Sequence, residues 1–228
     1  MEAVFSHKTL DFLIENRLRN DKEWFAAHKE DYTSHVVEPL AELTQYLAPV
    51  LAEIDGGLIC APRVGGSISR IWRDTRYAHD KSLFRDNMWC SFDRQKGMGL
   101  PEFYFVISPE GFQYGCGYYA AGTASMESLR ALILAEDRDF LAALAAYEAQ
   151  DEFLLGGEMY KKSRHPRQPE RLRNWLDRKN IGFDRGSADF DLLYSDRLAR
   201  TVAAGYRTLA PMYRFLMKAE ARRIQQNP

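Results

Sequence analysis

Two aspartates, Asp74 and Asp80, have the side chains in this sequence best suited to acid–base chemistry. They belong to residues 70–86, where eight of the seventeen residues are charged and large apolar residues stand between them. Large apolar side chains favour the core, whereas charged ones are rarely fully buried unless they are paired. A segment that mixes both is expected at the edge of a core or along a cleft, and we take residues 70–86 as the candidate site.

Basic residues surround the two aspartates and are suited to holding an anion. A guanidinium binds phosphate or carboxylate groups in a bidentate manner, and an ammonium binds them as a point charge. The residues predicted to bind such a ligand are Arg73, Arg76, Lys81 and Arg85. Asp74 and Asp80 are then the candidate catalytic groups. The alternative is a structural ion-pair network, the more common role of carboxylates beside several arginines.

A pair of glycines adds a second feature to the candidate site. Residues 112–118 alternate as a strand, which places Gly115 and Gly117 on one face and leaves that face without side chains. Another backbone or a ligand can approach closely there, and we predict Gly115 and Gly117 to bind the ligand. The competing and more common explanation is a helix packed on this face of the sheet.

The local charge is uneven although the net charge of the chain is only −1. Residues 161–179 hold eight Lys or Arg residues against Glu170 and Asp177, and residues 63–96 hold eight against four aspartates. If these segments meet, they form a basic surface around a cleft; otherwise the cations pair locally or lie over apolar surface. The near-neutral total disfavours a general nucleic-acid binder, and binding of nucleic acid through residues 161–179 remains the weakest of the alternatives.

Other chemistries lack their sequence signatures. The three cysteines, Cys60, Cys90 and Cys116, are widely spaced, which is typical of reduced thiols in a cytoplasmic protein. His79 lies beside the aspartates, but no spacing typical of metal ligands accompanies it, and we predict no metal and no cofactor. The sequence shows neither a signal peptide nor an apolar run long enough for a membrane helix, so no membrane association is expected.

The hydrophobic periodicity predicts an α+β fold. Helices are expected at residues 7–19, 22–38 and 40–54, with Asp21 as an N-cap and with an end or kink before Pro39. Strands are predicted at residues 67–73, 87–92, 103–107, 112–118, 158–165 and 181–183, and the pair at 103–118 is a hairpin around Pro109. Further helices are predicted at residues 125–135, 139–150, 170–178, 189–209 and 212–226, the last two separated by Pro211.

These elements predict one domain over residues 1–228. It has a helical start at 1–57, a sheet-forming region at 58–120 and a mainly helical remainder at 121–228. The expected architecture is a central antiparallel sheet of about four to six strands, with helices from both ends of the chain packed on it.

Three motifs in this order resemble the family catalogued as domain of unknown function 2461. They are Trp24-Phe25-x-x-His28-Lys29-x-x-Tyr32 with Val37-Glu38-Pro39, Arg73-Asp74-x-Arg76-Tyr77-x-x-Asp80-Lys81-Ser82, and the hairpin Phe103–Tyr118. The likeness covers most of the chain and includes Arg130. Leu83 stands where the family usually has proline, and His28 where asparagine is common. The resemblance implies a cytosolic single-domain protein and specifies no activity, cofactor or substrate.

Two functions follow as hypotheses. The first is binding of, or catalysis on, a small anionic metabolite that bears phosphate or carboxylate, at a charged cleft around residues 70–86. The alternative is a non-catalytic protein-interaction module in which the charged motif is a structural ion-pair scaffold. The sequence does not decide whether the protein is an enzyme or what its oligomeric state is.

Overall fold

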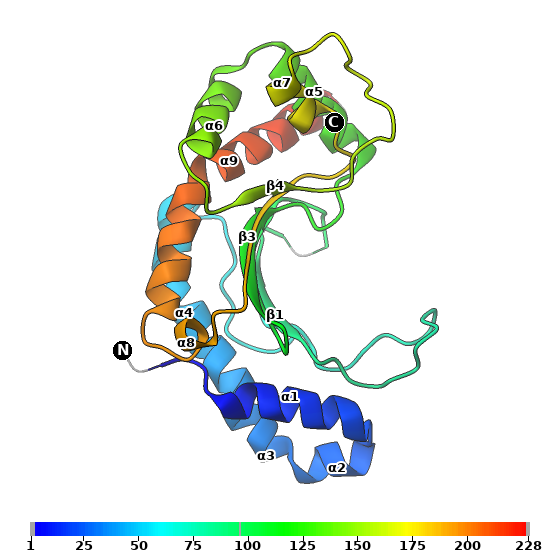
Figure 1. Cartoon of the computed structure of the whole chain (residues 1–228), viewed down its shortest axis with the longest axis vertical. Coiled ribbons are helices and arrows are strands. Elements are labelled where there is room, and N and C mark those ends of the chain that lie inside the picture. The colour runs from blue at the N-terminus through cyan, green and yellow to red at the C-terminus, as the bar shows by residue number, and fades with distance from the viewer. Residues whose placement is uncertain (1–2, 96, 227–228) are drawn as a thin grey trace. The chain divides into compact units, whose positions relative to one another are not determined.

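The computed structural model describes residues 3–95 and 97–226, which form a series of helices and one five-stranded sheet (Figure 1). The helical elements are α1 (His7–Arg19), α2 (Lys22–Ala27), α3 (Lys29–Tyr32), the π-helical turn η1 (Thr33–Val37), α4 (Glu38–Ile54), α5 (Thr123–Leu134), α6 (Arg138–Glu148), α7 (Glu170–Leu176), α8 (Phe190–Leu193) and α9 (Leu198–Gln226). The strands are β1 (Met88–Phe92), β2 (Glu102–Ser108), β3 (Gly111–Gly117), β4 (Leu154–Gly156) and β5 (Gly182–Ser187). Within the described residues, none of the helices has both the length and the apolar composition of a membrane span.

The sheet is antiparallel and has the strand order β1-β2-β3-β5-β4. Strands β2 and β3 form the predicted hairpin, and Gly111 begins β3 with a φ of +132°, a conformation that favours glycine. Along β2 the side chains of Phe103, Phe105 and Ile107 are buried and alternate with more exposed neighbours, as a strand with one covered face requires. The predicted α+β class, with helices before and after an antiparallel sheet, is confirmed.

By their internal contacts the described residues divide into two compact units. The first comprises Met1–Phe92, Tyr104–Tyr114 and Gly186–Ala204, and the second comprises Asp93–Phe103, Gly115–Arg185 and Gly205–Pro228. The single domain inferred from the sequence stays a prediction, since each unit is assembled from three separate stretches of the chain.

The core of the first unit forms where α4 packs on β1. Leu40, Leu43 and Leu47 of α4 are completely buried, because leucines at this spacing share one face of the helix. Thr44 of the same helix donates a hydrogen bond to Leu40 O at 2.8 Å, and its hydroxyl lies 3.4 Å from the Sγ of Cys90 in β1. This packing holds β1, which in turn supports the candidate site.

The core of the second unit is centred on Trp175 of α7. Its ring lies 5.5 Å from that of Phe140 in α6, 5.3 Å from that of Phe183 in β5 and 6.2 Å from that of Phe215 in α9. Aromatic pairs at such distances add to the stabilisation that burial alone provides. The short helix α7 is therefore anchored to three other elements of its own unit.

Two of the predicted strands are wrong. Residues 67–73 form only isolated bridges, and residues 158–165 are irregular while the real strand, β4, lies a few residues earlier. In the second segment the backbone is bonded to the turn after α7: the N–H of Tyr160 donates to Asp177 O at 2.8 Å, and that of Lys179 donates to Glu158 O at 2.6 Å. These bonds replace a regular ladder.

Of the two predicted proline breaks, the one before Pro39 is confirmed. The π-helical turn η1 interrupts the regular α-helix up to Val37, and α4 begins at Glu38, which places Pro39 in its first turn, where a missing N–H costs little. The break at Pro211 is wrong. Pro211 lies inside α9, which continues through it. A proline inside a helix costs about 3 kcal/mol, whereas each large apolar side chain buried beside it contributes about 1.5–3 kcal/mol. Leu209 and Met212 are both completely buried, and their burial offsets that cost.

Candidate functional site

Residues 67–87 form an extended hairpin, which we call the arm, that belongs to the first unit. The N–H of Arg73 donates to Leu83 O at 2.8 Å, and that of Arg85 donates to Ile71 O at 2.9 Å. At its base the N–H of Ser69 donates to Trp89 O at 2.9 Å, which joins the arm to β1. In Figure 1 the arm is the cyan-to-green loop that extends away from β1. The charged motif therefore occupies a projecting hairpin.

One side of the arm is held by an aromatic cluster. The ring of Phe84, which is completely buried, lies 4.4 Å from that of Trp72 and 5.0 Å from that of Phe25 in α2. Ile71 is buried as well. The interleaved apolar residues of the motif thus serve to pack the arm against the N-terminal helices.

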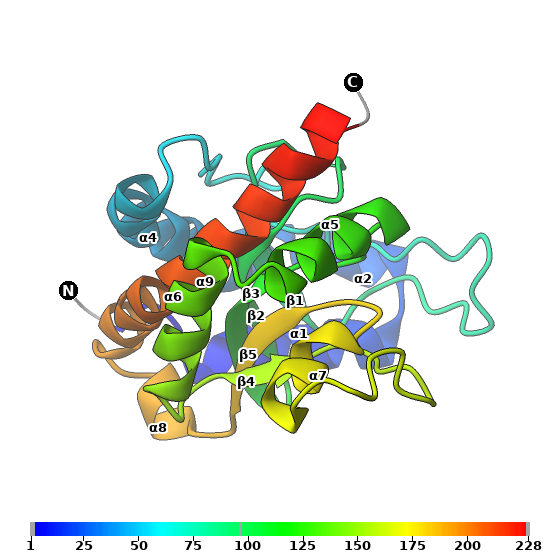
Figure 2. The ribbon, with the colours of Figure 1, turned by 90° about the horizontal axis from the view of Figure 1, so that it is seen from above.

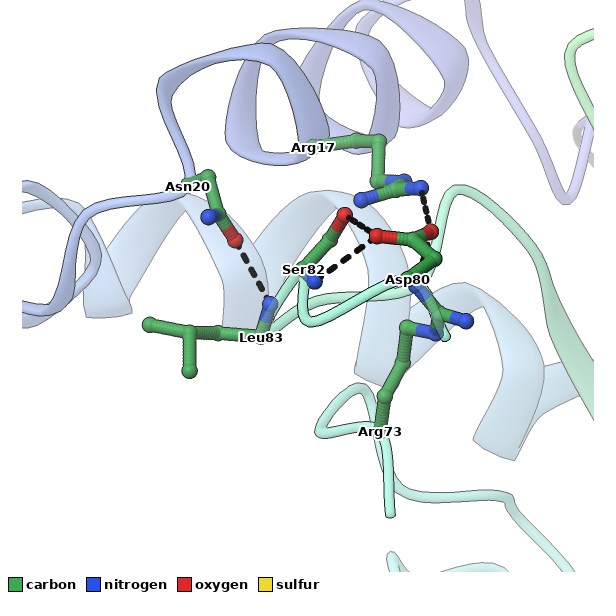
Figure 3. Close-up of polar contacts among 6 residues, drawn as sticks. All are labelled: Arg17, Asn20, Arg73, Asp80, Ser82 and Leu83. Carbon is green, nitrogen blue, oxygen red and sulfur yellow. Dashed lines mark hydrogen bonds and ion pairs between the residues drawn. The ribbon is translucent and has the colours of Figure 1, made fainter. Parts of the chain in front are cut away.

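Asp80 is the centre of the polar contacts on the arm (Figure 3). Its Oδ2 accepts a hydrogen bond from Arg17 Nη2 of α1 at 2.6 Å and another from Arg73 Nη1. Its Oδ1 accepts from the backbone N–H of Ser82 at 2.9 Å and from the Ser82 hydroxyl. One carboxylate therefore closes the loop of the arm on itself and also ties it to α1.

The last turn of α1 provides a second tie to the arm. The side-chain oxygen of Asn20, the C-cap of α1, accepts a hydrogen bond from the N–H of Leu83 at 2.6 Å (Figure 3). Asn20 has a φ of +50°, a backbone conformation that asparagine tolerates better than most residues. Neither Arg17 nor Asn20 was predicted as part of the site, because both lie 63 residues from their partners and no local pattern indicates the pairing.

Asp74 and Arg76 form a separate pair. The carboxylate accepts hydrogen bonds from Arg76 Nε at 3.0 Å and from Arg76 Nη2 at 2.7 Å. Both side chains are largely exposed, at 58% and 77%. Lys81, also exposed, donates to Thr75 O at 2.9 Å. Of the predicted residues, the structure brings Arg73 and Asp80 together, while Asp74, Arg76 and Lys81 make local contacts within the loop.

These contacts lower the pKa values of both aspartates. Hydrogen bonds from the hydroxyl and the N–H of Ser82, followed by the one from Arg73, hold the pKa of Asp80 well below its ordinary value. Hydrogen bonds from the side chain and the N–H of Arg76 lower the pKa of Asp74 to about 2. Both groups are ionised at neutral pH.

Arg85 has the least satisfied side chain of the motif. Its guanidinium lies 4.9 Å from the ring centroid of Trp89, within the range of a cation–π contact. Its Nε is buried and has no hydrogen-bond partner among the described residues. An unpaired buried donor costs free energy, which a ligand that reached this atom would recover.

The space beside Gly115 and Gly117 is occupied by strand β5. A Cβ at Gly115 would clash with the carbonyl oxygen of Phe183, and one at Gly117 would clash with Gly182 Cα. Both glycines belong to the second unit. The missing side chains thus allow the close approach of a neighbouring backbone, which is one of the alternatives considered from the sequence. The ligand-binding role of the glycines stays a prediction.

In the described part of the chain, Cys90 and Cys116 form no nucleophilic site, and the His, Cys, Asp and Glu side chains form no metal site. Burial raises the pKa of Cys90 to about 12, and it raises that of Cys116 well above the ordinary value. Such thiols stay protonated at neutral pH and are poor nucleophiles. No group of three or more His, Cys, Asp or Glu side chains is arranged to hold a metal ion among residues 3–95 and 97–226.

The fold and the site define an α+β protein with a charged hairpin arm tied to its N-terminal helix. The model of the family described as "Conserved hypothetical protein (DUF2461)" matches residues 8–215, and the chain belongs to this family. The match includes the whole arm as well as α1. No curated protein matches the sequence.

Proposed function

We propose that the protein is a non-catalytic interaction module, and that the arm is the element it presents to a partner protein. The observation that carries the proposal is that both aspartates of the motif are bound by arginines of the same unit. A carboxylate that already holds one or two guanidiniums acts as a structural clamp. The charged motif then serves to give the arm its shape.

Acid–base catalysis is disfavoured by the state of the two carboxylates. An efficient general acid or base has a pKa near the working pH. The pKa of Asp74 is about 2, and that of Asp80 is also lowered, so neither holds a proton to donate near pH 7. As bases they are weak, because their lone pairs already accept hydrogen bonds.

Binding of an anion between Arg17 and Arg73 is disfavoured for a related reason. The Oδ2 atom of Asp80 already lies where these two guanidiniums converge. A ligand would have to displace a carboxylate that the chain itself holds in place, and tethered groups compete at high effective concentration.

The exposed residues of the arm suit a protein partner. Tyr77, in the loop between the two aspartates, is 94% exposed, and Trp72 is 41% exposed. Tyrosine, tryptophan and arginine are enriched among the residues that dominate binding energies at protein interfaces. Large exposed aromatic side chains on a braced loop are therefore the proposed contact with the partner.

Site-specific photo-cross-linking tests the proposal. A photoreactive residue replaces Tyr77 in one variant and Tyr119, which is 91% exposed, in a matched control. The expected result is a discrete protein adduct from position 77 that excess wild-type chain suppresses and excess Tyr77→Ala chain does not. The proposal is contradicted if position 77 gives no specific adduct. It is also contradicted if excess Tyr77→Ala chain suppresses the adduct as strongly as excess wild-type chain does.

A second candidate, binding of a small anionic metabolite by the arm, is favoured by the unpartnered Nε of Arg85. A thermal-shift screen with phosphorylated and carboxylated metabolites tests it, since a ligand that binds only the native state raises the melting temperature. Arg85→Lys keeps the charge and removes the Nε donor, so it should abolish a true shift. Lys81→Ala tests the exposed cation in the same way. A flat screen, or shifts that both variants retain, excludes this function.

A further inference from the structure

A second basic region lies in the loop between β4 and α7, at residues 161–168, which we call the basic loop. It carries four exposed cations, Lys161, Lys162, Arg164 and Arg167. Within the range the structure describes, none of the four forms an ion pair, and Glu170, the first residue of α7, pairs with none of them. Figure 2 shows the loop in yellow-green beside α7. The four cationic side chains of the loop therefore have no carboxylate within ion-pair distance among the described residues.

A buried carboxylate fixes the backbone of the basic loop. Asp177, which is 3% exposed, accepts a hydrogen bond from the N–H of Arg164 at 2.9 Å. Burial raises the pKa of Asp177, but hydrogen bonds from Ser163 and from the N–H of Arg164, followed by the charge and the N–H of His165, outweigh it, and the net shift is downward. The ionised Asp177 thus acts on loop backbone and on Ser163, and it leaves the four cationic side chains unpaired.

Three cations lie around the ring of Tyr160, the residue just before the basic loop. The guanidinium carbon of Arg164 lies 3.7 Å from the ring centroid, that of Arg130 lies 5.5 Å away, and Lys179 Nζ lies 5.9 Å away. Arg130 is itself fixed, because its Nε donates to Leu176 O at 2.8 Å and its Nη2 donates to Arg178 O at 2.6 Å. The ring therefore orients Arg164 on a rigid base, and a preorganised cation loses little freedom when it binds an anion.

The loop also forms a shallow depression. Its lining is continuous in sequence and consists of Arg164, His165, Pro166, Arg167 and Gln168. Two of these residues are arginines and one is a histidine, and no acidic residue is part of the lining. Guanidinium forks match the oxygen geometry of phosphate groups.

We propose that the basic loop binds a ligand with two or more linked phosphate groups. A single phosphate would engage only the depression, whereas a polyphosphate carries further charges for Lys161 and Lys162, which are exposed and precede Arg164 in the same loop. The near-neutral net charge of the chain gives little general attraction for anions, so binding depends on this local cluster. The ligand class includes free polyphosphates and the phosphate chains of nucleotides.

Calorimetric titration at constant ionic strength tests the proposal, with inorganic tripolyphosphate and orthophosphate as probes. Tripolyphosphate should bind saturably and at least about tenfold more tightly than orthophosphate, because each additional charged hydrogen bond contributes a factor of this order. The Arg164→Gln/Arg167→Gln variant should lose about tenfold or more of that affinity. Lys161→Gln/Lys162→Gln, which leaves the stacking on Tyr160 intact, should lose affinity too.

The matched control is Arg200→Gln, which removes one exposed cation of the first unit that is paired with Asp196. It should leave tripolyphosphate binding unchanged. Equal affinities for the two probes, or equal losses in the control and the loop variants, overturn the proposal. So does a single-stranded oligonucleotide that binds through the loop while tripolyphosphate does not, since that result assigns the surface to nucleic acid. A further titration with ATP then distinguishes nucleotides from free polyphosphates as the ligand.

Discussion

The arm and the basic loop are both rich in arginine and lysine, but only the arm supplies carboxylates for its cations. In the arm, Asp80 binds Arg17 and Arg73, and Asp74 binds Arg76. In the basic loop Asp177 is buried and bonds to backbone and to Ser163, and none of the four exposed cations of the loop forms an ion pair in the described residues. The two segments therefore differ in one respect: the arm is braced by carboxylates that pair with two of its arginines, Arg73 and Arg76, whereas the cations of the basic loop form no ion pair in the described part of the chain.

This difference shows that charge density alone does not identify a ligand site. The arm has the denser mixture of charge and aromatic residues, and for that reason the sequence indicates it as a ligand site. Whether a cation is open to a ligand depends on whether a carboxylate of the same unit reaches it. Such pairing depends on contacts between residues far apart in the sequence.

The largest effect is expected for Arg130→Ala, beneath the basic loop. Arg130 is 9% exposed and its guanidinium satisfies two backbone carbonyls at the end of α7. Hydrogen bonds to a charged donor contribute about 1.5–3 kcal/mol each, so the variant should lose about 3 kcal/mol or more of unfolding free energy.

Urea unfolding measures this loss. The control is Arg138→Ala, an exposed arginine at the start of α6, which should change stability by no more than about 0.5 kcal/mol. If the two variants lose the same amount, Arg130 is not a structural support of the loop, and the contrast between a rigid basic loop and a braced arm no longer holds.

An intermediate effect is expected for Asp80→Ala, which removes the clamp between the arm and α1. Hydrogen exchange should accelerate several-fold at the N–H groups of Arg73, Leu83 and Arg85, whose bonds hold the arm together. The amides of β1 should be unaffected, because α4 packs on that strand independently of the arm.

Asp74→Ala is the control for this measurement, since its bonds stay within the loop and do not reach α1. It should leave exchange at Leu83 unchanged. Equal acceleration in both variants would show that the arm is held by overall charge, and that Asp80 has no special role.

The local elements of this chain were predictable because their determinants are local. The leucine spacing in α4, the N-cap of Asp21 and the Pro109–Gly111 turn each act over a few residues, and all three are present as expected, with Asp21 accepting from the N–H of Trp24 at 2.8 Å. Pro211 was misinterpreted because the stability of α9 at that point comes from the burial of neighbouring residues, which the local pattern does not contain.

The candidate site was only half predictable for the same reason. Charge and aromatic interleaving identified Arg73 and Asp80. The partners on α1, Arg17 and Asn20, depend on the tertiary fold, and so does the occupation of the space beside Gly115 by β5. The basic loop was recognised as a charge cluster, but the unpaired state of its cations required the structure.

The smallest effect concerns the pH dependence of the arm. Both Asp74 and Asp80 have pKa values below the ordinary 3.8, so their ionised forms are favoured by folding. A lowered pKa contributes stability that is fully present above the unfolded value and is lost as the pH falls through the folded value. For Asp74 that window runs from pH 3.8 down to about 2. Neutral and mildly acidic solutions should leave the arm unchanged.

Carboxyl ¹³C chemical shifts followed by NMR resolve the two groups. The expected midpoint for Asp74 is about 2, and that of Asp80 should also lie below 3.8, shifted mainly by the hydrogen bond from the Ser82 hydroxyl. Ser82→Ala should raise the midpoint of Asp80 and leave that of Asp74 unchanged. A midpoint near 3.8 for either wild-type group would mean that its arginine is not held. The arm would then carry free cations like those of the basic loop, and an external anion would become as plausible a ligand for one region as for the other.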